Sequence, residues 1–358
     1  YYFIGEGYRF QGDSNAALNS YNEALKINNQ FGPAYLGLAR ARLMQDPNAP
    51  VDELFNLAIQ YDPSFGEVYL ERANYYLLHT DPASALTDLE TAREIMPDSP
   101  LVYYGLARVY QAQEEIPTAL ENAEKAYELD ITLLPNYLLR GELYMQLERY
   151  DDALKALNTY AVYETRDGRA LALIGECYYR LGDYASAIEF LTKGLRLDPK
   201  QRQIYEYRAF SYLETEKPQD ALIDFDRAVP FTGETFEIKI GQVRGYYALQ
   251  KFGSAYQQAE GAYSLAETDQ EKALALYWRA LSNEGRGAIS EAVKDWQALL
   301  KLPASAMSED MRTEADDHLR TIALITPSPT PKPVTPTKTR TPAPSRTPTR
   351  TPTRTPVP

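Results

Sequence analysis

The side chains that most often carry out chemistry are few and scattered in this chain. It has two histidines, His79 and His318, far apart in the sequence, and a single cysteine, Cys177. Metal sites bring several such ligands together at characteristic spacings, and none of those spacings occurs here. No glycine-rich phosphate loop and no nucleophile motif can be found either. The sequence therefore predicts no catalytic, metal-binding or cofactor-binding residues and no enzymatic activity.

Pairs of adjacent carboxylates are the other candidates for acid–base chemistry. They occur at Asp151–Asp152, Asp316–Asp317 and Glu114–Glu115, where we expect helix starts or exposed turns. Negative side chains near a helix N-terminus are stabilised by the helix dipole, which explains these pairs without a reaction. Cys177 lies beside an apolar helix face, so we expect a buried, inert thiol, and one cysteine excludes a disulfide within the chain.

The dominant pattern is a set of small residues that recur every 34 positions. Three such ladders run along the chain, and an aromatic ladder with the same period accompanies them. The first ladder consists of Gly5, Ala39, Ala73, Ala107, Gly141, Gly175 and Ala209, and the aromatic ladder of Tyr8, Tyr76, Tyr110, Tyr144, Tyr178, Tyr212 and Tyr246. A fixed period of this length predicts a solenoid, in which each unit buries its apolar face against its neighbours.

Each unit has the pattern of two helices. In residues 170–199, apolar side chains at helical spacing precede Gly182, which suits the left-handed turn that ends a helix. A second amphipathic stretch, residues 184–197, ends at Asp198 and Pro199, because proline cannot continue a helix. We expect the small residues where two helices cross closely and the tyrosines in the wider gaps between units.

These features resemble the tetratricopeptide repeat (TPR), most closely in the segment "LGDYASAIEFLTKGLRLDP" at residues 181–199. The resemblance covers nine units over residues 1–304 and implies an all-α, right-handed superhelical solenoid. Residues 305–325 follow, where residues 308–325 read as one further helix that caps the last unit.

The resemblance also implies a concave groove lined by the first helix of each unit. Carried over unit by unit, its peptide-binding residues are Leu70, Asn74, Leu77, Tyr104, Arg108, Gln111, Leu138, Glu142, Met145, Glu176, Tyr179, Glu206, Phe210, Leu213, Arg244, Tyr247, Tyr277, Leu281 and Glu284. A lining that contains tyrosines suits proline-rich extended peptides, which lose little entropy on binding. The alternative is that about half of these side chains only pack against one another.

Residues 326–358 form a tail of different composition, in which a third of the residues are proline and a third are threonine. Such a segment favours an extended polyproline II conformation. Threonine- and proline-rich tracts resemble the O-glycosylated stalks of surface proteins, and the repeating context makes five threonines the best candidates for modification: Thr347, Thr349, Thr351, Thr353 and Thr355. An unmodified flexible tether is the alternative.

The tail and the helical body carry opposite charge. The whole chain has 37 basic and 50 acidic residues, a net charge of −13. Six of the basic residues and none of the acidic ones lie in the tail, so the body has 31 basic and 50 acidic residues and a net charge of −19. Acidic bodies repel phosphates, which argues against nucleic acid as a partner. No apolar run approaches the length of a membrane span.

Two functional hypotheses follow from these observations. In the first, this is an extracellular or cell-surface structural protein that assembles head to tail into a filament by placing its tail in the groove of the next copy. In the second, it is a scaffold of the periplasm, envelope or cytoplasm that binds a foreign peptide, with the tail as a tether. Other protein chains, copies of itself included, are the expected partners in both, and the first adds glycans on the tail.

Overall fold

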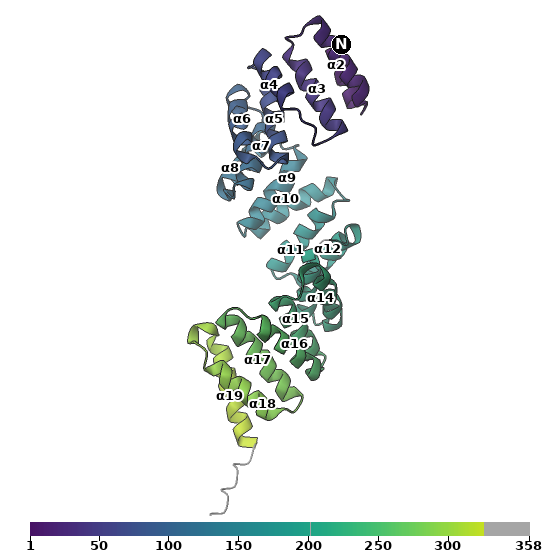
Figure 1. Ribbon diagram of the computed structural model, residues 1–358. Helices are drawn as coiled ribbons and strands as arrows, with labels where there is room; N and C mark the ends of the chain where they lie inside the picture. The colour runs from purple at the N-terminus through teal and green to yellow at the C-terminus, as the bar shows by residue number, and fades with distance from the viewer. Residues whose placement is uncertain (201, 326–358) are drawn as a thin grey trace, which may run out of the picture.

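The computed structural model describes residues 1–200 and 202–325, which form an elongated all-helical solenoid (Figure 1). Within this part of the chain there are nine helix pairs, α1 to α18, followed by a short 3₁₀ helix, η1 (Ala304–Ala306), and by α19 (Glu309–Ile325). No strand occurs in the described residues. The predicted all-α solenoid with a terminal helix is confirmed, and the tail of residues 326–358 lies outside the described residues.

Each unit consists of a first and a second helix. The first helices are α1 (Tyr2–Phe10), α3 (Gly32–Gln45), α5 (Gly66–Leu78), α7 (Pro100–Ala112), α9 (Leu134–Gln146), α11 (Gly168–Arg180), α13 (Arg202–Glu214), α15 (Phe236–Ala248) and α17 (Asp269–Gly285). The second helices are α2 (Ser14–Ile27), α4 (Asp52–Tyr61), α6 (Pro82–Ile95), α8 (Ile116–Leu129), α10 (Tyr150–Tyr163), α12 (Tyr184–Leu197), α14 (Pro218–Thr232), α16 (Phe252–Leu265) and α18 (Ile289–Leu300).

The ladder of small residues lies where the two helices of a unit cross. A Cβ atom on Gly141 would lie 2.5 Å from Leu157 Cδ2, and one on Gly175 would lie 2.6 Å from Leu191 Cγ. Both distances are too short for a real contact, so only glycine allows this approach at these two crossings. The alanines of the ladder, such as Ala107 in α7, are fully buried.

A second pattern, which the ladders do not reveal, fills the position one residue before each small residue. From the second to the seventh unit this position alternates between an aliphatic and an arginine side chain: Leu38, Arg72, Leu106, Arg140, Ile174 and Arg208. The arginines pair with carboxylates sixteen residues away, as in Arg72–Asp88 at 2.6 Å, Arg140–Glu124 at 2.9 Å and Arg208–Asp224 at 2.6 Å. Each arginine therefore ties a first helix to a second helix through a largely buried ion pair.

The first helices form the inner layer of the solenoid. α1 contacts α3, and from α5 onward each first helix contacts the first helix of the next unit. The second helices lie outside this layer and reach their neighbours mainly through the intervening first helices. Close approach within one layer places that layer on the inside of a curved stack, so the first helices line the concave side, as the resemblance implies.

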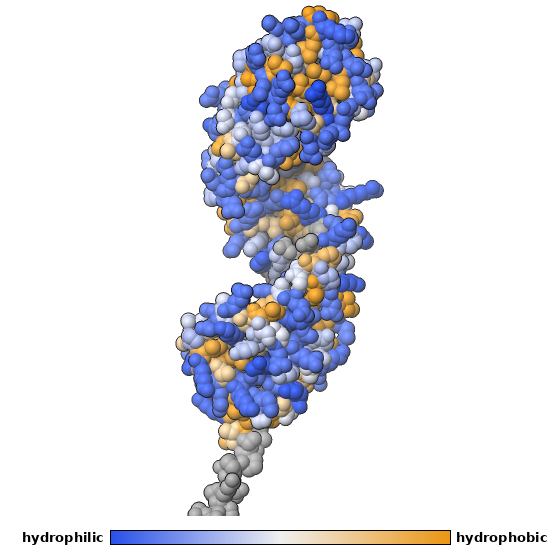
Figure 2. All heavy atoms as spheres, in the orientation of Figure 1, coloured by the Kyte–Doolittle hydropathy of each residue, from blue (hydrophilic) through white to orange (hydrophobic). Residues whose placement is uncertain are grey.

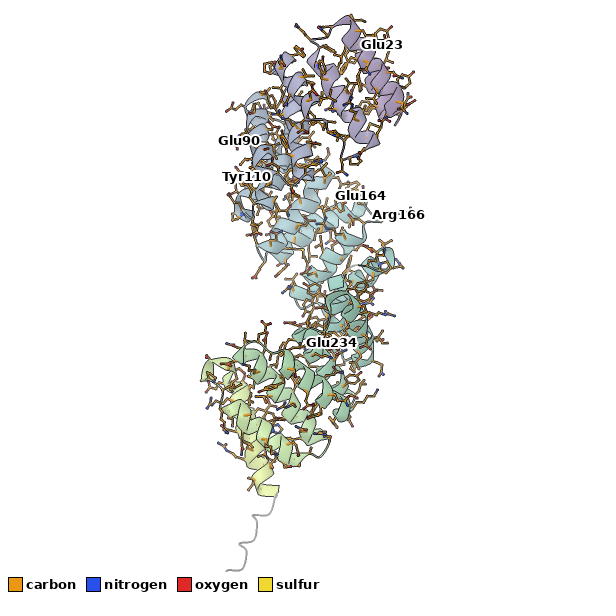
Figure 3. All side chains as sticks on the ribbon, viewed as in Figure 1. Glu23, Glu90, Tyr110, Glu164, Arg166 and Glu234 are labelled. Carbon is orange, nitrogen blue, oxygen red and sulfur yellow. The ribbon has the colours of Figure 1, made fainter. Side chains whose placement is uncertain are left out.

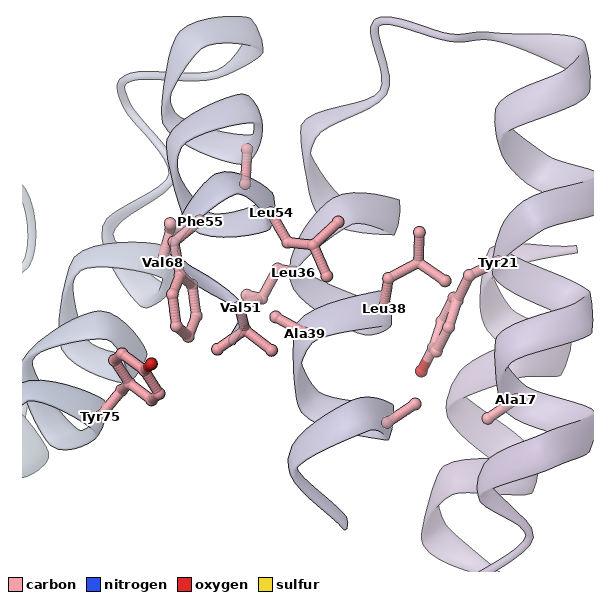
Figure 4. Close-up of a cluster of buried hydrophobic side chains, with 12 residues drawn as sticks. Ala17, Tyr21, Leu36, Leu38, Ala39, Val51, Leu54, Phe55, Val68 and Tyr75 are labelled. Atoms are coloured by element: carbon pink, nitrogen blue, oxygen red, sulfur yellow. The ribbon is translucent and has the colours of Figure 1, made fainter. Parts of the chain in front are cut away.

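The second unit departs from the regular pattern. Its helices α3 and α4 are joined by residues 46–51, which include Pro47 and Pro50, and α4 is only 10 residues long. Proline favours extended backbone before it and cannot donate a hydrogen bond, so the second helix begins late. The unit is still held by a buried core in which Tyr21 of α2 faces Leu38 of α3, and Phe55 of α4 lies beside Val68 of α5 (Figure 4).

The last helix covers the end of the stack, as predicted for a cap. Ala315 of α19 is fully buried, and Leu319 and Ile322 pack against the cluster around Trp296. The His318 ring stacks on the Trp296 ring with a centroid distance of 4.9 Å, and His318 Nδ1 lies 2.8 Å from Glu284 Oε2. α19 is therefore joined to the last unit by both apolar and polar contacts.

Candidate peptide-binding groove

The residues predicted to line the groove lie on consecutive first helices, from α5 to α17. All of them are partly buried except Leu70 and Leu281, which are buried. Two neighbouring units are linked directly along this face, because Arg108 Nη1 donates to Asn74 Oδ1 at 3.1 Å. Partial exposure along one layer is what a groove requires, but it does not show that a ligand binds there.

Some of these side chains are engaged in packing rather than available to a ligand. Phe210 packs edge-to-face against Phe225 of the neighbouring second helix, with a centroid distance of 5.0 Å. Glu284 accepts hydrogen bonds from Trp296 Nε1 at 2.5 Å and lies against His318, so it belongs to the junction with α19. Together with the buried Leu70 and Leu281, they agree with the alternative that part of the set serves the core.

A hollow that we call the central pocket opens between α9 and α11. Its volume is about 320 Å³, and its walls include the predicted residues Glu142, Met145 and Glu176. The remaining lining residues, which the sequence analysis did not select, are Gln146, Tyr150, Arg169, Leu173 and Arg180. Arg180 and Gln146 lie at the ends of their helices, one position after the groove positions that the resemblance supplied.

The charged groups of the central pocket are arranged in two layers. The side chains of Glu142 and Glu176 are only 15% and 20% exposed, whereas those of Arg169 and Arg180 are 63% and 45% exposed. Arg169 Nη2 lies 2.6 Å from Glu142 Oε1, yet this buried oxygen accepts no hydrogen bond from the described residues. Burial raises the pKa of Glu142 above its ordinary value, against the opposing effects of Arg169 and Gln111.

Glu176 is held in place by an aromatic neighbour. The Tyr207 hydroxyl donates to the Glu176 carboxylate, and burial together with this carboxylate raises the pKa of Tyr207 to about 12. Tyr207 also packs against the predicted groove residue Tyr179, with a centroid distance of 5.2 Å. The tyrosine therefore remains a neutral donor, and the Glu176 carboxylate has a fixed position on the pocket floor.

A second hollow, the aromatic pocket, lies nearer the C-terminal end of the same layer. It has a volume of about 450 Å³, and its lining residues are Leu213, Glu216, Pro218, Arg244, Tyr247, Ala248 and Trp278. Three of these, Leu213, Arg244 and Tyr247, were predicted. The Tyr247 and Trp278 rings meet edge-to-face at 5.6 Å, and Arg244 Nη2 is paired with Glu214 Oε1 at 2.7 Å.

The first two units carry concave residues that the sequence analysis left out. Phe10, Met44 and Leu78 lie 34 positions apart at the ends of α1, α3 and α5, and they are 79%, 44% and 67% exposed. Figure 2 shows apolar surface over these N-terminal helices, at the top of the view. The signal was present in the sequence, because extending the groove positions back by one or two units reaches the neighbours of these residues.

The largest hollow lies on the outer side, over α6, α7 and α8. It has a volume of about 920 Å³, and its lining includes Tyr110, which Figure 3 labels near Glu90. Several of its charged residues already have partners, as in Lys125–Glu128 at 3.1 Å and the pairing of Glu124 with Arg140. These pairs satisfy the polar groups internally, so this hollow offers a ligand less than the groove does.

The remaining reactive side chains are held by local contacts. Cys177 is fully buried, and burial raises the pKa of its thiol to about 12, so the group stays protonated at neutral pH. His79 Nδ1 lies 2.8 Å from the Tyr75 carbonyl oxygen of its own helix. Across the part of the chain that the structure describes, no three metal-ligating side chains come together, and no helix is long and apolar enough to span a membrane.

Comparisons with known proteins identify the repeat. Residues 1–31 and residues 138–202 match family models described as tetratricopeptide repeat. The chain is 27% identical over 229 residues to human Tetratricopeptide repeat protein 6, a match that covers 62% of this chain and 43% of that protein. It is 26% identical over 182 residues to human DnaJ homolog subfamily C member 3, covering 47% and 36%. These matches span less than half of the length of each relative.

The solved structures agree on the fold. The C-terminal part of a TPR repeat-containing protein from Cytophaga hutchinsonii is similar to this chain with a TM-score of 0.53 and 16% sequence identity. The match covers 70% of this chain and 99% of that one. At this level of identity the likeness is one of fold alone.

Proposed function

Since the chain is a solenoid built from tetratricopeptide repeats, a scaffold suited to protein–protein interaction, we propose that its concave groove binds an extended peptide segment of another protein chain. The observation that carries this proposal is the layer of partly exposed first-helix side chains, interrupted by the central and aromatic pockets. Extended peptides fit such a layer because successive side chains can enter successive hollows.

We propose binding without catalysis. The carboxylates of the groove are paired with arginines or with a tyrosine hydroxyl, as in Glu142 with Arg169 and Glu176 with Tyr207. Such pairing holds side chains in place and neutralises charge, which suits a recognition surface. The role is that of a scaffold that brings chains together.

Display of random twelve-residue peptides against the full chain tests this function. The variant Leu173→Arg places a long cation in the central pocket and should abolish the recovery of groove-binding peptides. Ile223→Arg is the matched control, because Ile223 is 47% exposed on the outer helix α14. Peptides that are lost with Ile223→Arg, or that bind Leu173→Arg as well as the wild type, would contradict groove binding.

A second candidate is head-to-tail self-assembly, in which the partner is a copy of the same chain. One face of α1 favours it: Tyr1, Ile4 and Tyr8 are 59%, 53% and 38% exposed, whereas Leu38, the counterpart of Ile4 in the next unit, is only 6% exposed. This face is therefore open to a further helix pair. Opposite charge on body and tail would attract the tail of one copy to the groove of the next.

Deleting residues 326–358 tests the self-assembly candidate by electron microscopy. If the tail joins neighbouring copies, the full chain forms filaments at high concentration and the truncated chain does not, because contacts of this head-to-tail type propagate unless they close a ring. Filaments of equal length from both proteins, or monomers from both, would count against this candidate.

Location at the cell surface and O-linked sugar on the tail complete the self-assembly proposal. Both rest on the composition of residues 326–358, in which threonine and proline alternate with single basic residues. Mass spectrometry of tail peptides from native material tests the modification at Thr347, Thr349, Thr351, Thr353 and Thr355. Unmodified threonines at all five positions would remove the glycosylated stalk and leave a plain tether.

A further inference from the structure

The two pockets of the groove differ in chemistry, and this difference specifies the peptide. We propose that the central pocket takes a cationic side chain, Lys or Arg, and that the aromatic pocket takes a proline or aromatic side chain of the same extended segment. The inference rests on the proposed function, since it assumes that the groove binds a peptide, and it adds which residues that peptide must carry.

The central pocket favours a cation because its carboxylates are the fixed groups. Glu142 receives a hydrogen bond from Gln111 and Glu176 receives one from Tyr207, so both are held on the floor of the pocket. A buried acceptor without a donor is unfavourable, and Glu142 Oε1 is such an acceptor. An ammonium or guanidinium group entering the pocket would donate to it.

The arginines of the pocket do not compete strongly with such a ligand. Arg169 and Arg180 are long side chains at the rim, each about half exposed or more, and they can turn into solvent while remaining hydrated. A ligand carboxylate, in contrast, would meet the two fixed carboxylates beneath them. The net charge of −19 on the helical body adds a long-range attraction for basic segments.

The aromatic pocket favours a flat apolar side chain. Its only cation, Arg244, is already paired with Glu214, and the edge-to-face pair of Tyr247 and Trp278 forms a wall opposite Leu213 and Pro218. Aromatic walls of this kind bind proline and aromatic side chains, which lose little conformational freedom on binding.

The positions of the pockets set the spacing between the two ligand residues. The central pocket lies between α9 and α11, and the aromatic pocket is lined by α13, α15 and α17, so they are about two first-helix steps apart. Packed helices lie roughly 8–10 Å apart, and an extended chain advances about 3.3 Å per residue. We therefore expect the cation and the apolar residue to be roughly five or six positions apart in the peptide.

The test is the sequence pattern of twelve-residue peptides recovered by display on the full chain. The wild type should enrich peptides with a Lys or Arg and a proline or aromatic residue at that spacing. Glu142→Gln keeps the shape of the side chain and removes its charge, so the best of these peptides should bind about tenfold more weakly. Glu164→Gln is the control of equal charge change, at an exposed position between α10 and α11 (Figure 3).

The aromatic pocket is tested by a matched pair of alanines. Ala248→Glu places a carboxylate in the aromatic pocket and should remove the preference for proline or aromatic residues. Ala112→Glu introduces the same group at the corresponding exposed position of α7, four units of 34 residues earlier, and should leave binding unchanged.

The outcomes separate this inference from the proposed function. Recovered peptides that lack the two-residue pattern, or that bind Glu142→Gln and Ala248→Glu as tightly as the wild type, would overturn the inference and leave the scaffold function standing. If the wild-type chain enriches no peptide at all, the groove-binding function fails and the inference fails with it.

Discussion

At the scale of single residues, the least expected feature is the buried arginine that recurs in alternate units. Arg208 donates from Nε to Asp224 Oδ2 at 2.6 Å and from Nη1 to Thr192 Oγ1 at 2.9 Å, so it joins α13 to both α14 and α12. One unit earlier, the same two positions are Ile174 and Phe190. The fold therefore accepts either a charged or an apolar pair at this junction.

This alternation predicts the cost of breaking one pair. Asp224→Ala leaves the Arg208 guanidinium buried without its carboxylate, so the free energy of unfolding in urea should fall by about 3–5 kcal/mol. The double variant Arg208→Ile/Asp224→Phe installs the pair of the preceding unit and should recover most of the loss. A double variant as unstable as the single one would show that the two kinds of pair are not interchangeable.

Burial of Glu142 predicts a pH dependence of stability. Its pKa in the folded chain is above the ordinary value of 4.5, because burial disfavours the charged carboxylate. The folded state therefore holds this proton more tightly than the unfolded state, and the stabilising effect is lost as the pH rises through the folded-state pKa. Relative to Glu142→Gln, wild type should lose stability as the pH rises above 4.5, as measured by urea denaturation. A difference that does not change with pH would contradict the raised pKa.

At the scale of elements, the turn between the two helices of a unit depends on one left-handed residue. Gly12, Gly182 and Gly287 have φ angles of 77° to 81° there, and five other units place Thr80, Glu114, Glu148, Glu216 and Gln250 at 56° to 63°. The recurrence every 34 residues shows that the turn geometry is kept even where the side chain opposes it. A non-glycine residue in this region is strained by roughly 1–2 kcal/mol.

Two glycine substitutions of opposite sign test the turn. Gly182→Ala should lower the free energy of unfolding by about 1 kcal/mol, because φ is +80° at this position. Gly7→Ala should raise it by roughly 0.5–1 kcal/mol, because Gly7 lies inside α1 and an added Cβ meets nothing within 4 Å. Thermal denaturation of the two variants should shift in opposite directions, and a shift in the same direction would contradict this account of the turn.

The ends of regular helices could be predicted from the sequence because local signals agree there. The stretch predicted over residues 184–197 is α12, whose start is fixed by Asp183, which accepts a hydrogen bond from the Ser186 backbone N–H at 3.1 Å. In the second unit the signals conflict: the period places Val51 at a helical position, but Val51 precedes α4. The two prolines nearby prevail over the period.

At the scale of the whole molecule, nine helix pairs and a terminal helix could be predicted because the period repeats often enough to average out local exceptions. The pockets could not be predicted, because their walls combine side chains of neighbouring units, as Glu142 of α9 combines with Arg169 and Leu173 of α11. The predicted groove residues lie on the expected layer, but the resemblance gave no means to separate Met145, which lines a pocket, from Phe210, which packs on Phe225. Whether they bind a peptide stays a prediction.

The central claim, that a peptide lies in the concave groove, is tested most directly by photo-crosslinking. A benzophenone amino acid replaces Met145 in the central pocket of one protein and Glu121 in the outer hollow of another, and each is irradiated with the peptides recovered by display. We expect crosslinked peptide from position 145 and none from position 121. Crosslinks from position 121 alone, or equal crosslinks from both positions, would contradict the claim.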